Sequence, residues 1–302
     1  MRILVSGSSG LIGSQLMQRL LAEGHDVVRL VRQTGVPNSI LWNPEQRDLD
    51  VHHLNDCDAV IHLCGENIGD GRWTKDKMRR IRSSRVESTR LLCEKLATLP
   101  NPPRVFLAAS ATGIYGHRPG EILDENSVTG KGFLAEVCSA WESASVSASR
   151  AGIRTVHLRF GAMLTSQGAF LQRLLPWFRM GLGGNVGRGR QYWTWISLVD
   201  AISAILHVLR WEDISGAVNV VSPEPATNAE ITRAIAKAVR RPAILPAPPF
   251  LLSLLYGSIV KDVLCASQRV VPTKLLESGF QFRFPGINAA IEEALCEKNG
   301  SG

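Results

Sequence analysis

The sequence has no long hydrophobic run. Its longest apolar stretch, at residues 250–256, is interrupted by a serine and is far shorter than the roughly 20 apolar residues that a membrane-spanning helix needs. A glycine motif follows the first few residues directly, so we expect no signal peptide. These absences predict a cytoplasmic protein that does not enter a membrane.

Cysteine is sparse, and no C-x-x-C pair occurs. A zinc site or the disulfide framework of a secreted domain would require closely and regularly spaced cysteines. We therefore expect reduced thiols, no disulfides and no metal site. The six cysteines stand at positions 57, 64, 93, 138, 265 and 296.

Concentrated charge is also lacking, because the net charge of +7 is spread over 302 residues. The densest basic stretch, residues 75–85, contains no aromatic side chain. Nucleic-acid binding would favour a more concentrated patch with interleaved aromatic residues. We interpret the stretch as the solvated face of a helix and expect no nucleic-acid partner. Its basic residues are Lys75, Lys77, Arg79, Arg80, Arg82 and Arg85.

Near the N-terminus, by contrast, a glycine motif stands between an apolar run at residues 3–5 and a helical pattern of leucines. In this order of strand, turn and helix, Gly7 permits a tight turn, Gly10 lets the backbone approach a phosphate, and Gly13 lets the helix pack closely on the strand. The helix N-terminus would offer free N–H groups to the anion. The motif predicts a dinucleotide site, the alternative being an ordinary glycine-rich turn. Its residues are Gly7, Ser8, Ser9, Gly10, Leu11, Ile12 and Gly13.

The next predicted strand, residues 26–31, ends in Arg32, and no acidic residue follows closely. A carboxylate at this position would bind the ribose 2′-hydroxyl of NAD, whereas a guanidinium can bind a 2′-phosphate. We therefore predict NADP(H) as the cofactor, with Arg32 as the main contact and Ser8 or Ser9 as helpers. The alternative is that Arg32 is a solvated strand-end residue.

Strand-like and helix-like segments alternate through the first two-thirds of the chain, which predicts βαβ units and a parallel sheet. We expect a doubly wound α/β (Rossmann) domain at residues 1–165, its sheet completed by parts of 195–225. Residues 166–302 are expected to form a smaller, interleaved lobe on the substrate side. The predicted strands are 2–6, 26–31, 58–63, 104–109 and 154–159, and the helices are 11–23, 74–98 and 133–151.

Polar residues follow two of the predicted strands. The strand at 104–109 leads into Ser110, Thr112 and Tyr115, and the strand at 58–63 leads into residues 64–67. Ligands of open α/β sheets bind at the carboxyl ends of the strands, so these residues are candidates for the active site. The glycine-rich residues 181–190 are expected to form a flap over that site or a mobile surface loop.

Together these motifs resemble those of the extended short-chain dehydrogenase/reductase superfamily. The chain is most similar to the branch of epimerase-family proteins that carries a C-terminal domain of unknown function. The stretches that carry this resemblance are 64–68, 84–89, 181–184 and 223–228. The resemblance implies a small-molecule substrate and a homodimer formed by the helices at 74–98 and 133–151. It also implies that Leu63, Cys64 and Gly65 line the ribose of the cofactor and that Trp42 or Asn43 borders the adenine.

The chain departs from the superfamily at the catalytic helix. Members of the superfamily usually carry Tyr-x-x-x-Lys there, with the tyrosine as the proton donor. When Glu142 is aligned with the usual glutamate of that helix, the tyrosine position becomes Leu134 and the lysine position becomes Cys138. Neither side chain can take over the proton chemistry of this pair.

Two hypotheses for the function follow. The first is an NADP(H)-dependent oxidoreductase or epimerase-like enzyme that acts on a small carbonyl or hydroxyl substrate. In it Tyr115 is the acid/base, Ser110 or Thr112 holds the substrate oxygen, and Glu66 or Asn67 orients the substrate. The second is a catalytically weak or inactive NADPH-binding regulatory protein that acts through a protein partner.

Overall fold

An eight-stranded sheet forms the centre of this computed structural model, which describes residues 1–257 and 259–296. The strand order is β12-β8-β6-β5-β1-β2-β3-β4, and every pairing is parallel except that of β3 with β4. The strands are β1 (Arg2–Ser6), β2 (Asp26–Val31), β3 (Ser39–Asn43), β4 (Asp48–Leu49), β5 (Ala59–His62), β6 (Val105–Ala111), β8 (Arg154–Phe160) and β12 (Gly216–Val220).

The strand order reverses beside β1, because β2 pairs with one of its edges and β5 with the other. In the register, Ser6 lies opposite His62 at the carboxyl ends of β1 and β5. A crevice outside the sheet forms where the order reverses, and it is the usual ligand site of such folds. The predicted doubly wound α/β fold is thus confirmed.

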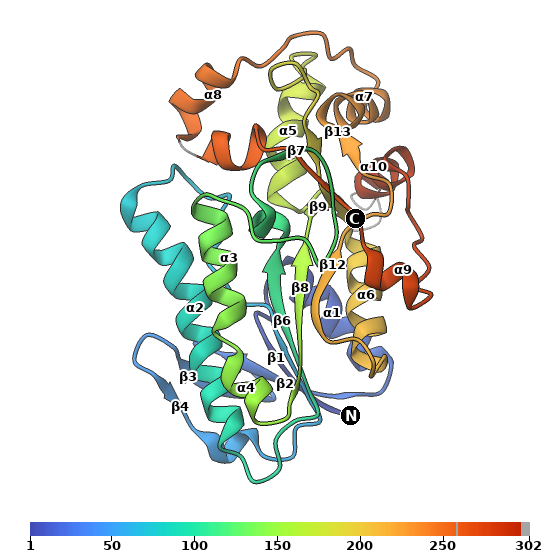
Figure 1. Cartoon of the computed structure of the whole chain (residues 1–302). Coiled ribbons are helices and arrows are strands. Elements are labelled where there is room, and N and C mark those ends of the chain that lie inside the picture. The colour runs from blue at the N-terminus through green and yellow to red at the C-terminus, as the bar shows by residue number, and fades with distance from the viewer. Residues whose placement is uncertain (258, 297–302) are drawn as a thin grey trace.

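Helices cover both faces of the sheet, as Figure 1 shows. The residues of β1 alternate between the two sides: Ile3 and Val5 pack with α1 (Leu11–Ala22) and α6 (Leu198–Arg210). Leu4 packs on the other side with Leu91 and Leu92 of α2 (Lys75–Ala97). All three β1 side chains are completely buried, as is expected for a parallel strand between two helical layers.

The helix predicted at 133–151 is interrupted and forms α3 (Phe133–Ser143) and α4 (Val146–Arg150). Ser145 lies at the break, and its hydroxyl donates a hydrogen bond to the carbonyl of Glu142 at 2.8 Å. The same hydroxyl lies 2.7 Å from Nε2 of His157 on β8. A serine hydroxyl that bonds to the backbone competes with helical hydrogen bonding, so the chain turns here.

The second lobe is mainly helical and lies beyond the carboxyl ends of the strands (Figure 1). Its core joins α5, α7 and α10 around Trp193 and Trp195, which are both buried. The helices of the lobe are α5 (Ala169–Arg179), α7 (Asn228–Val239), α8 (Pro249–Tyr256), η3 (Val260–Leu264) and α10 (Ile287–Cys296), whereas α9 (Thr273–Glu277) packs beside β12 and α6. The remaining short elements are η1 (Val51–Leu54), η2 (Thr112–Tyr115), β7 (Arg118–Leu123), β9 (Ala162–Leu164), β10 (Tyr192–Trp193), β11 (Trp195–Ser197), β13 (Ala226–Thr227) and β14 (Gln268–Val270).

The glycine-rich residues 181–190 are held by the rest of this lobe rather than forming a free flap. The carbonyls of Gly183 and Asn185 accept the N–H groups of Leu245 and Ala247 at 3.2 and 2.8 Å. The N–H of Val186 donates to Oδ1 of Asn228 at 2.8 Å. The expectation of a flap is therefore wrong, because a distant segment of the chain pairs with the loop. Among the described residues, no helix is long and apolar enough to cross a membrane.

Candidate functional site

The turn between β1 and α1 has a shape that only glycine allows at two positions. Gly7 has a φ of +71°, and a Cβ there would lie 2.8 Å from the carbonyl carbon of Leu63. A Cβ on Gly13 would lie 2.1 Å from the carbonyl oxygen of Gly7. The turn, the first helix and the segment after β5 therefore pack backbone against backbone. The two glycines thus have the roles that the motif predicted for them.

The N-terminus of α1 is open toward this turn. Gly10 is the N-cap residue, no side chain caps the helix, and its first turn holds no acidic residue. The backbone N–H groups of Leu11 and Ile12 thus have no intrahelical acceptor. Ser9 is exposed and Ser8 half-buried beside them. Free N–H groups at the positive end of a helix dipole form a site for a phosphate.

Arg32 directly follows the carboxyl end of β2, the strand next to β1. Its side chain is exposed. Within the described part of the chain, no carboxylate lies within ion-pair distance of it. The guanidinium is therefore free to bind an anion at the same edge of the sheet as the glycine turn.

A buried histidine connects the ends of β1 and β5. Nδ1 of His62 lies 2.7 Å from Oγ of Ser6, and Nε2 lies 3.3 Å from Oγ of Ser88 on α2. Sγ of Cys64 lies 3.7 Å from Nε2 of His62. Burial alone would raise the pKa of Cys64, but the charge and hydrogen bonds of His62 and the hydroxyls of Ser88 and Ser6 lower it to about 7. Cys64 therefore has an acidic thiol next to the glycine turn.

Ser110 at the end of β6 is joined to a buried ion pair. Its hydroxyl donates to Oε1 of Glu142 at 2.7 Å, and its exposed fraction is 3%. Arg159 of β8 donates to both oxygens of the same carboxylate, at 2.8 and 2.9 Å. The Arg159 guanidinium holds the pKa of Glu142 below its usual range, although burial alone would raise it. Because the Ser110 proton is directed to a carboxylate, the serine oxygen remains as a hydrogen-bond acceptor.

Tyr115 is not available as the predicted acid/base. The side chain is completely buried, and its hydroxyl donates to Oδ1 of Asn219 at 2.7 Å and accepts from Nη1 of Arg159 at 2.9 Å. Burial raises the pKa of Tyr115. The interpretation of Tyr115 as a catalyst is therefore corrected: it is a packed residue that holds β12 and β8 beside η2. Thr112, at the start of η2, is also buried, and its catalytic role stays a prediction.

The positions of the usual tyrosine and lysine form an apolar wall on α3. The side chain of Leu134 packs against Gly113, where a Cβ would lie 3.2 Å from Cβ of Leu134. Cys138 is buried, and burial raises the pKa of its thiol to about 12. Neither residue can hold or release a proton near neutral pH, and their assignment to the tyrosine and lysine positions stays a prediction.

The basic residues at 75–85 do not all lie on a solvated helix face, so this expectation is corrected. The residue Lys77 is 6% exposed, and its Nζ donates to Oε1 of Glu66 at 2.8 Å. Nε of Arg80 lies 3.5 Å from the same oxygen. Arg85 is half-buried and lies over the Trp141 ring. The burial of Lys77 and Arg85 was not predicted. The sequence did hold a signal for it, because each lies four residues from the apolar Ile81, which places all three on one face of α2.

Trp42 does not lie at the surface where an adenine could rest against it. Its exposed fraction is 3%, and its ring packs edge-on to the His62 ring with the centroids 6.0 Å apart. Trp42 is therefore a core residue, and the sequence-based expectation for it is corrected. Asn43 is half-buried, and its Oδ1 accepts the N–H groups of Glu45 and Gln46.

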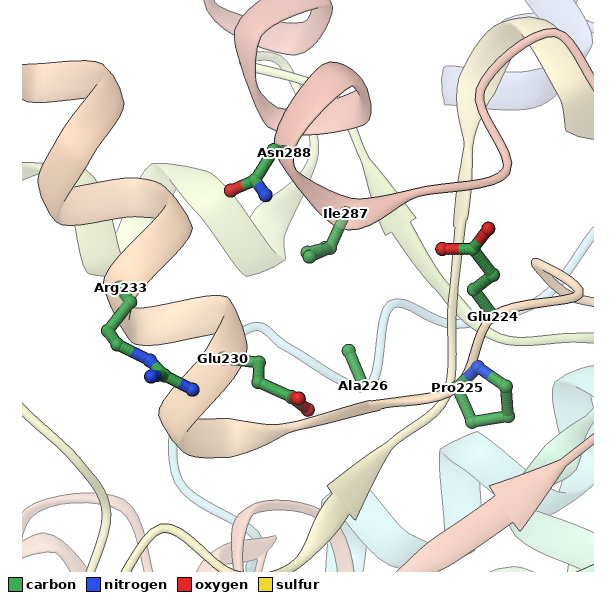
Figure 2. A pocket seen from close by; sticks show the side chains of 7 residues that line it. All are labelled: Glu224, Pro225, Ala226, Glu230, Arg233, Ile287 and Asn288. Carbon is green, nitrogen blue, oxygen red and sulfur yellow. The ribbon is translucent and has the colours of Figure 1, made fainter.

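A hollow of about 370 Å³ lies in the second lobe, on elements that do not contribute to the glycine turn. Figure 2 shows the carboxylate groups of Glu224 and Glu230, the guanidinium of Arg233 and the Asn288 side chain around it, between α7 and α10. Glu230 also closes the N-terminus of α7, where its carboxylate accepts the N–H of Thr227 at 2.7 Å. This hollow therefore belongs to the capping of α7 and is separate from the candidate site.

Comparison with known proteins agrees with this geometry. The profile of the NAD dependent epimerase/dehydratase family matches residues 3–222, and that of a domain of unknown function, DUF1731, matches residues 247–294. An epimerase family protein of Mycobacterium tuberculosis is 40% identical over 290 residues, which cover 96% of each chain. The human epimerase family protein SDR39U1 is 33% identical and is matched over 98% of this chain and 100% of its own.

Solved structures of two similar proteins have the same fold. The crystal structure of human SDR39U1 with NADPH superposes with a TM-score of 0.89 and 33% identity, over 97% of this chain and 99% of that one. The nucleoside-diphosphate sugar epimerase of Corynebacterium glutamicum superposes with a TM-score of 0.82 and 33% identity, over 98% of this chain and 58% of that one.

Proposed function

Because this chain belongs to the NAD dependent epimerase/dehydratase family, we propose that it binds NADP(H) and uses it in an oxidoreductase or epimerase-like reaction. The substrate is a small molecule with a carbonyl or hydroxyl group. The observation that carries the proposal is the open glycine turn over α1 together with Arg32 at the end of the next strand, without a neighbouring carboxylate. The NADPH in the human relative supports it.

The residues present fit the cofactor. The turn at residues 7–13 would hold the pyrophosphate through its N–H groups, and Arg32 with Ser8 or Ser9 would hold the 2′-phosphate. Leu63, Cys64 and Gly65 would line the ribose next to the nicotinamide, because they follow β5 at the point where the strand order reverses. When bound, the nicotinamide supplies or accepts the hydride.

The protein's own contribution to the reaction is to hold the substrate oxygen. Ser110 donates its proton to Glu142, so its oxygen keeps the lone pairs with which it would accept a hydrogen bond from the substrate. A substrate hydroxyl can donate to that oxygen, so the serine would orient the alcohol form of the substrate. When a carbonyl is reduced by the hydride of the nicotinamide, water would supply the proton that completes this hydroxyl, because Leu134 and Cys138 donate none near neutral pH.

Consumption of NADPH in the presence of a panel of aldehydes, ketones and 2-oxo acids tests the catalytic part of the proposal. We expect slow but measurable turnover that falls at least tenfold in Ser110→Ala and is kept in Tyr115→Phe, because the Tyr115 hydroxyl is buried away from the crevice. Turnover that disappears in Tyr115→Phe while NADPH binding is kept would contradict this assignment.

A second candidate is a regulatory protein that binds NADPH and signals through a protein partner. The absence of an acid/base group at Leu134 and Cys138 favours it. It predicts tight NADPH binding with no oxidation of NADPH by any compound of the same panel. Measurable turnover that depends on Ser110 would exclude it.

We also propose that the protein is cytoplasmic. All six cysteines are free in the structure, which fits the reducing conditions of the cytoplasm.

A homodimer through α2, α3 and α4 is also proposed. The groove between these helices supports it, and this groove is lined by residues that include Val86, Ala140 and the exposed Val146. Sedimentation of the purified chain as a monomer at all concentrations would contradict the dimer.

A further inference from the structure

The guanidinium of Arg85 lies beside the turn that follows β5. A Cβ on Gly65 would lie 3.1 Å from Cζ of Arg85 and 3.4 Å from its Nη1. On its other side, Cζ lies 5.1 Å from the centroid of the Trp141 ring. The cation is thus held between α3 and an exposed glycine at the carboxyl edge of the sheet, next to the residues proposed for the cofactor ribose.

The donors of Arg85 are used much less than those of two other partly or fully buried arginines. Arg159 donates to both oxygens of Glu142 and to Tyr115. Arg154 donates to three backbone carbonyls. Within residues 1–257 and 259–296, the hydrogen bond found for Arg85 runs from Nη1 to the carbonyl of Ile81 at 3.1 Å. A guanidinium has five N–H donors in a planar fork, so most of this fork is available to a ligand.

The charge of Arg85 is not neutralised by the protein. The one carboxylate found to influence it among the described residues is that of Glu66, which already contacts Lys77 at 2.8 Å and Arg80 at 3.5 Å. Two other groups that face it, the thiols of Cys138 and Cys64, come from α3 and from the turn after β5. Burial lowers the pKa of the Arg85 guanidinium. Glu66 is therefore shared by Lys77 and Arg80, and no ion pair is found for Arg85 within the described part of the chain.

We propose that Arg85 binds a carboxylate group of the substrate. This inference rests on the proposed function, because it places the substrate beside the nicotinamide end of the cofactor. The planar fork of a guanidinium matches a carboxylate in a bidentate pair, and a partly buried pair of this kind is stronger than one in water. The Trp141 ring lies against Cζ of the guanidinium and helps to hold it at this place. The substrate class is thus a small carboxylic acid that carries a carbonyl or hydroxyl group.

Binding measurements on the complex with NADPH test this assignment. The change in NADPH fluorescence is followed while 2-oxo acids, or the methyl esters of the same acids, are added. We expect at least one acid of the panel to bind tenfold or more tightly than its ester. Arg85→Gln should remove this preference without changing the affinity for NADPH. Arg85→Lys should keep part of it, because the charge remains while the bidentate geometry is lost.

Arg82→Gln is the matched control, since Arg82 is exposed on the same helix, and it should leave the preference unchanged. If the chain binds NADPH but binds acids and esters equally, or binds neither, the inference about Arg85 is overturned. The proposed cofactor is upheld in that case. Loss of NADPH affinity in Arg85→Gln also overturns the inference and places the guanidinium on the cofactor. Failure of the wild-type chain to bind NADPH overturns the proposed function, and this inference with it.

Discussion

The most unusual single side chain near the glycine turn is Cys64. Its thiol lies against the buried His62 ring, which Ser6 and Ser88 hold from either side. The other thiols in the interior behave oppositely: burial raises the pKa of Cys93 well above the usual range and that of Cys138 to about 12. The environment of each thiol therefore determines which of them ionises near neutral pH.

We predict that Cys64 is alkylated much faster than Cys93 or Cys138, with a rate that rises through about pH 7. The physical reason is that the thiolate is the reactive form and that His62 stabilises it. Peptide mapping by mass spectrometry after short exposure to iodoacetamide at a series of pH values measures this. Bound NADPH should slow the reaction, because the cofactor would cover the turn.

Cys64→Ser provides the control that identifies the modified peptide. A rate for Cys64 that rises only in the ordinary thiol range near ~8.5 would show that His62 does not stabilise the thiolate.

Some of these side chains could be identified from the sequence and others could not. Gly13 could, because its role depends on neighbours within one βαβ unit. Gly7 packs in addition on Leu63 after β5, and the role of Arg32 stays a prediction. Tyr115 could not, because its hydroxyl bonds to Asn219, which is 104 residues away in the sequence. A hydroxyl after a strand can turn toward the crevice or toward the sheet, and only distant residues decide which.

Among the secondary-structure elements, β1 and α1 depend most on close backbone packing. We predict that Gly13→Ala lowers the affinity for NADPH at least tenfold and the free energy of unfolding by roughly 1–3 kcal/mol, as overpacking does. The new Cβ would lie 2.1 Å from the carbonyl oxygen of Gly7, so α1 must move away from the turn. Urea unfolding and a fluorescence titration with NADPH measure the two effects.

Ser14→Ala is a suitable control, since Ser14 is the next residue on α1 and is exposed. It should change neither quantity appreciably. Unchanged NADPH affinity in Gly13→Ala would contradict the role of close packing in forming the phosphate site.

The ion pair of Glu142 with Arg159 ties α3 to β8. The folded protein holds the pKa of Glu142 below its unfolded value of ~4.3, so the pair contributes stability above that pH. This contribution is lost as the pH falls through the lowered pKa of the folded state. Acid should therefore weaken the contact between α3 and β8. Raising the pH above neutrality should leave this ion pair unchanged, because the Glu142 carboxylate is already ionised.

We predict that Glu142→Gln lowers the free energy of unfolding by about 3–5 kcal/mol at neutral pH, because it leaves the Arg159 charge buried without its partner. Chemical denaturation measures the change. Glu94→Gln breaks the exposed pair with Arg47 and should cost at most ~1 kcal/mol. Equal losses in the two variants would show that burial does not strengthen the Glu142 pair.

The limits of several elements follow from the sequence, and others need the tertiary structure. The predicted strands at 2–6 and 26–31 match β1 and β2 to the residue, because each is a short apolar run between turn residues. The break between α3 and α4 was not predicted, since it depends on the contact of Ser145 with His157 of β8. Strand β3 was not predicted either, because its exposed Leu41 and buried Trp42 differ little in polarity.

Across the whole molecule, the parallel sheet brings the residues of the candidate site to one edge. The glycine turn, Arg32, Gly65 and Ser110 all lie at carboxyl ends of neighbouring parallel strands. The parallel sheet itself could be predicted from the alternation of segments. The anchoring of residues 181–190 could not, because the pairing segment at 245–247 lies beyond two intervening helices, α6 and α7.

We propose that the exposed guanidinium of Arg32 binds the 2′-phosphate of NADP(H). Calorimetric titration of the wild-type chain and of Arg32→Ala with NADPH and with NADH tests it most directly, with Gln33→Ala, the next exposed residue, as the control. We predict at least tenfold tighter binding of NADPH than of NADH by the wild type, about 1.4 kcal/mol. This preference should be lost in Arg32→Ala and kept in Gln33→Ala. Equal affinities of the wild-type chain for the two nucleotides, or binding of neither, would contradict the claim.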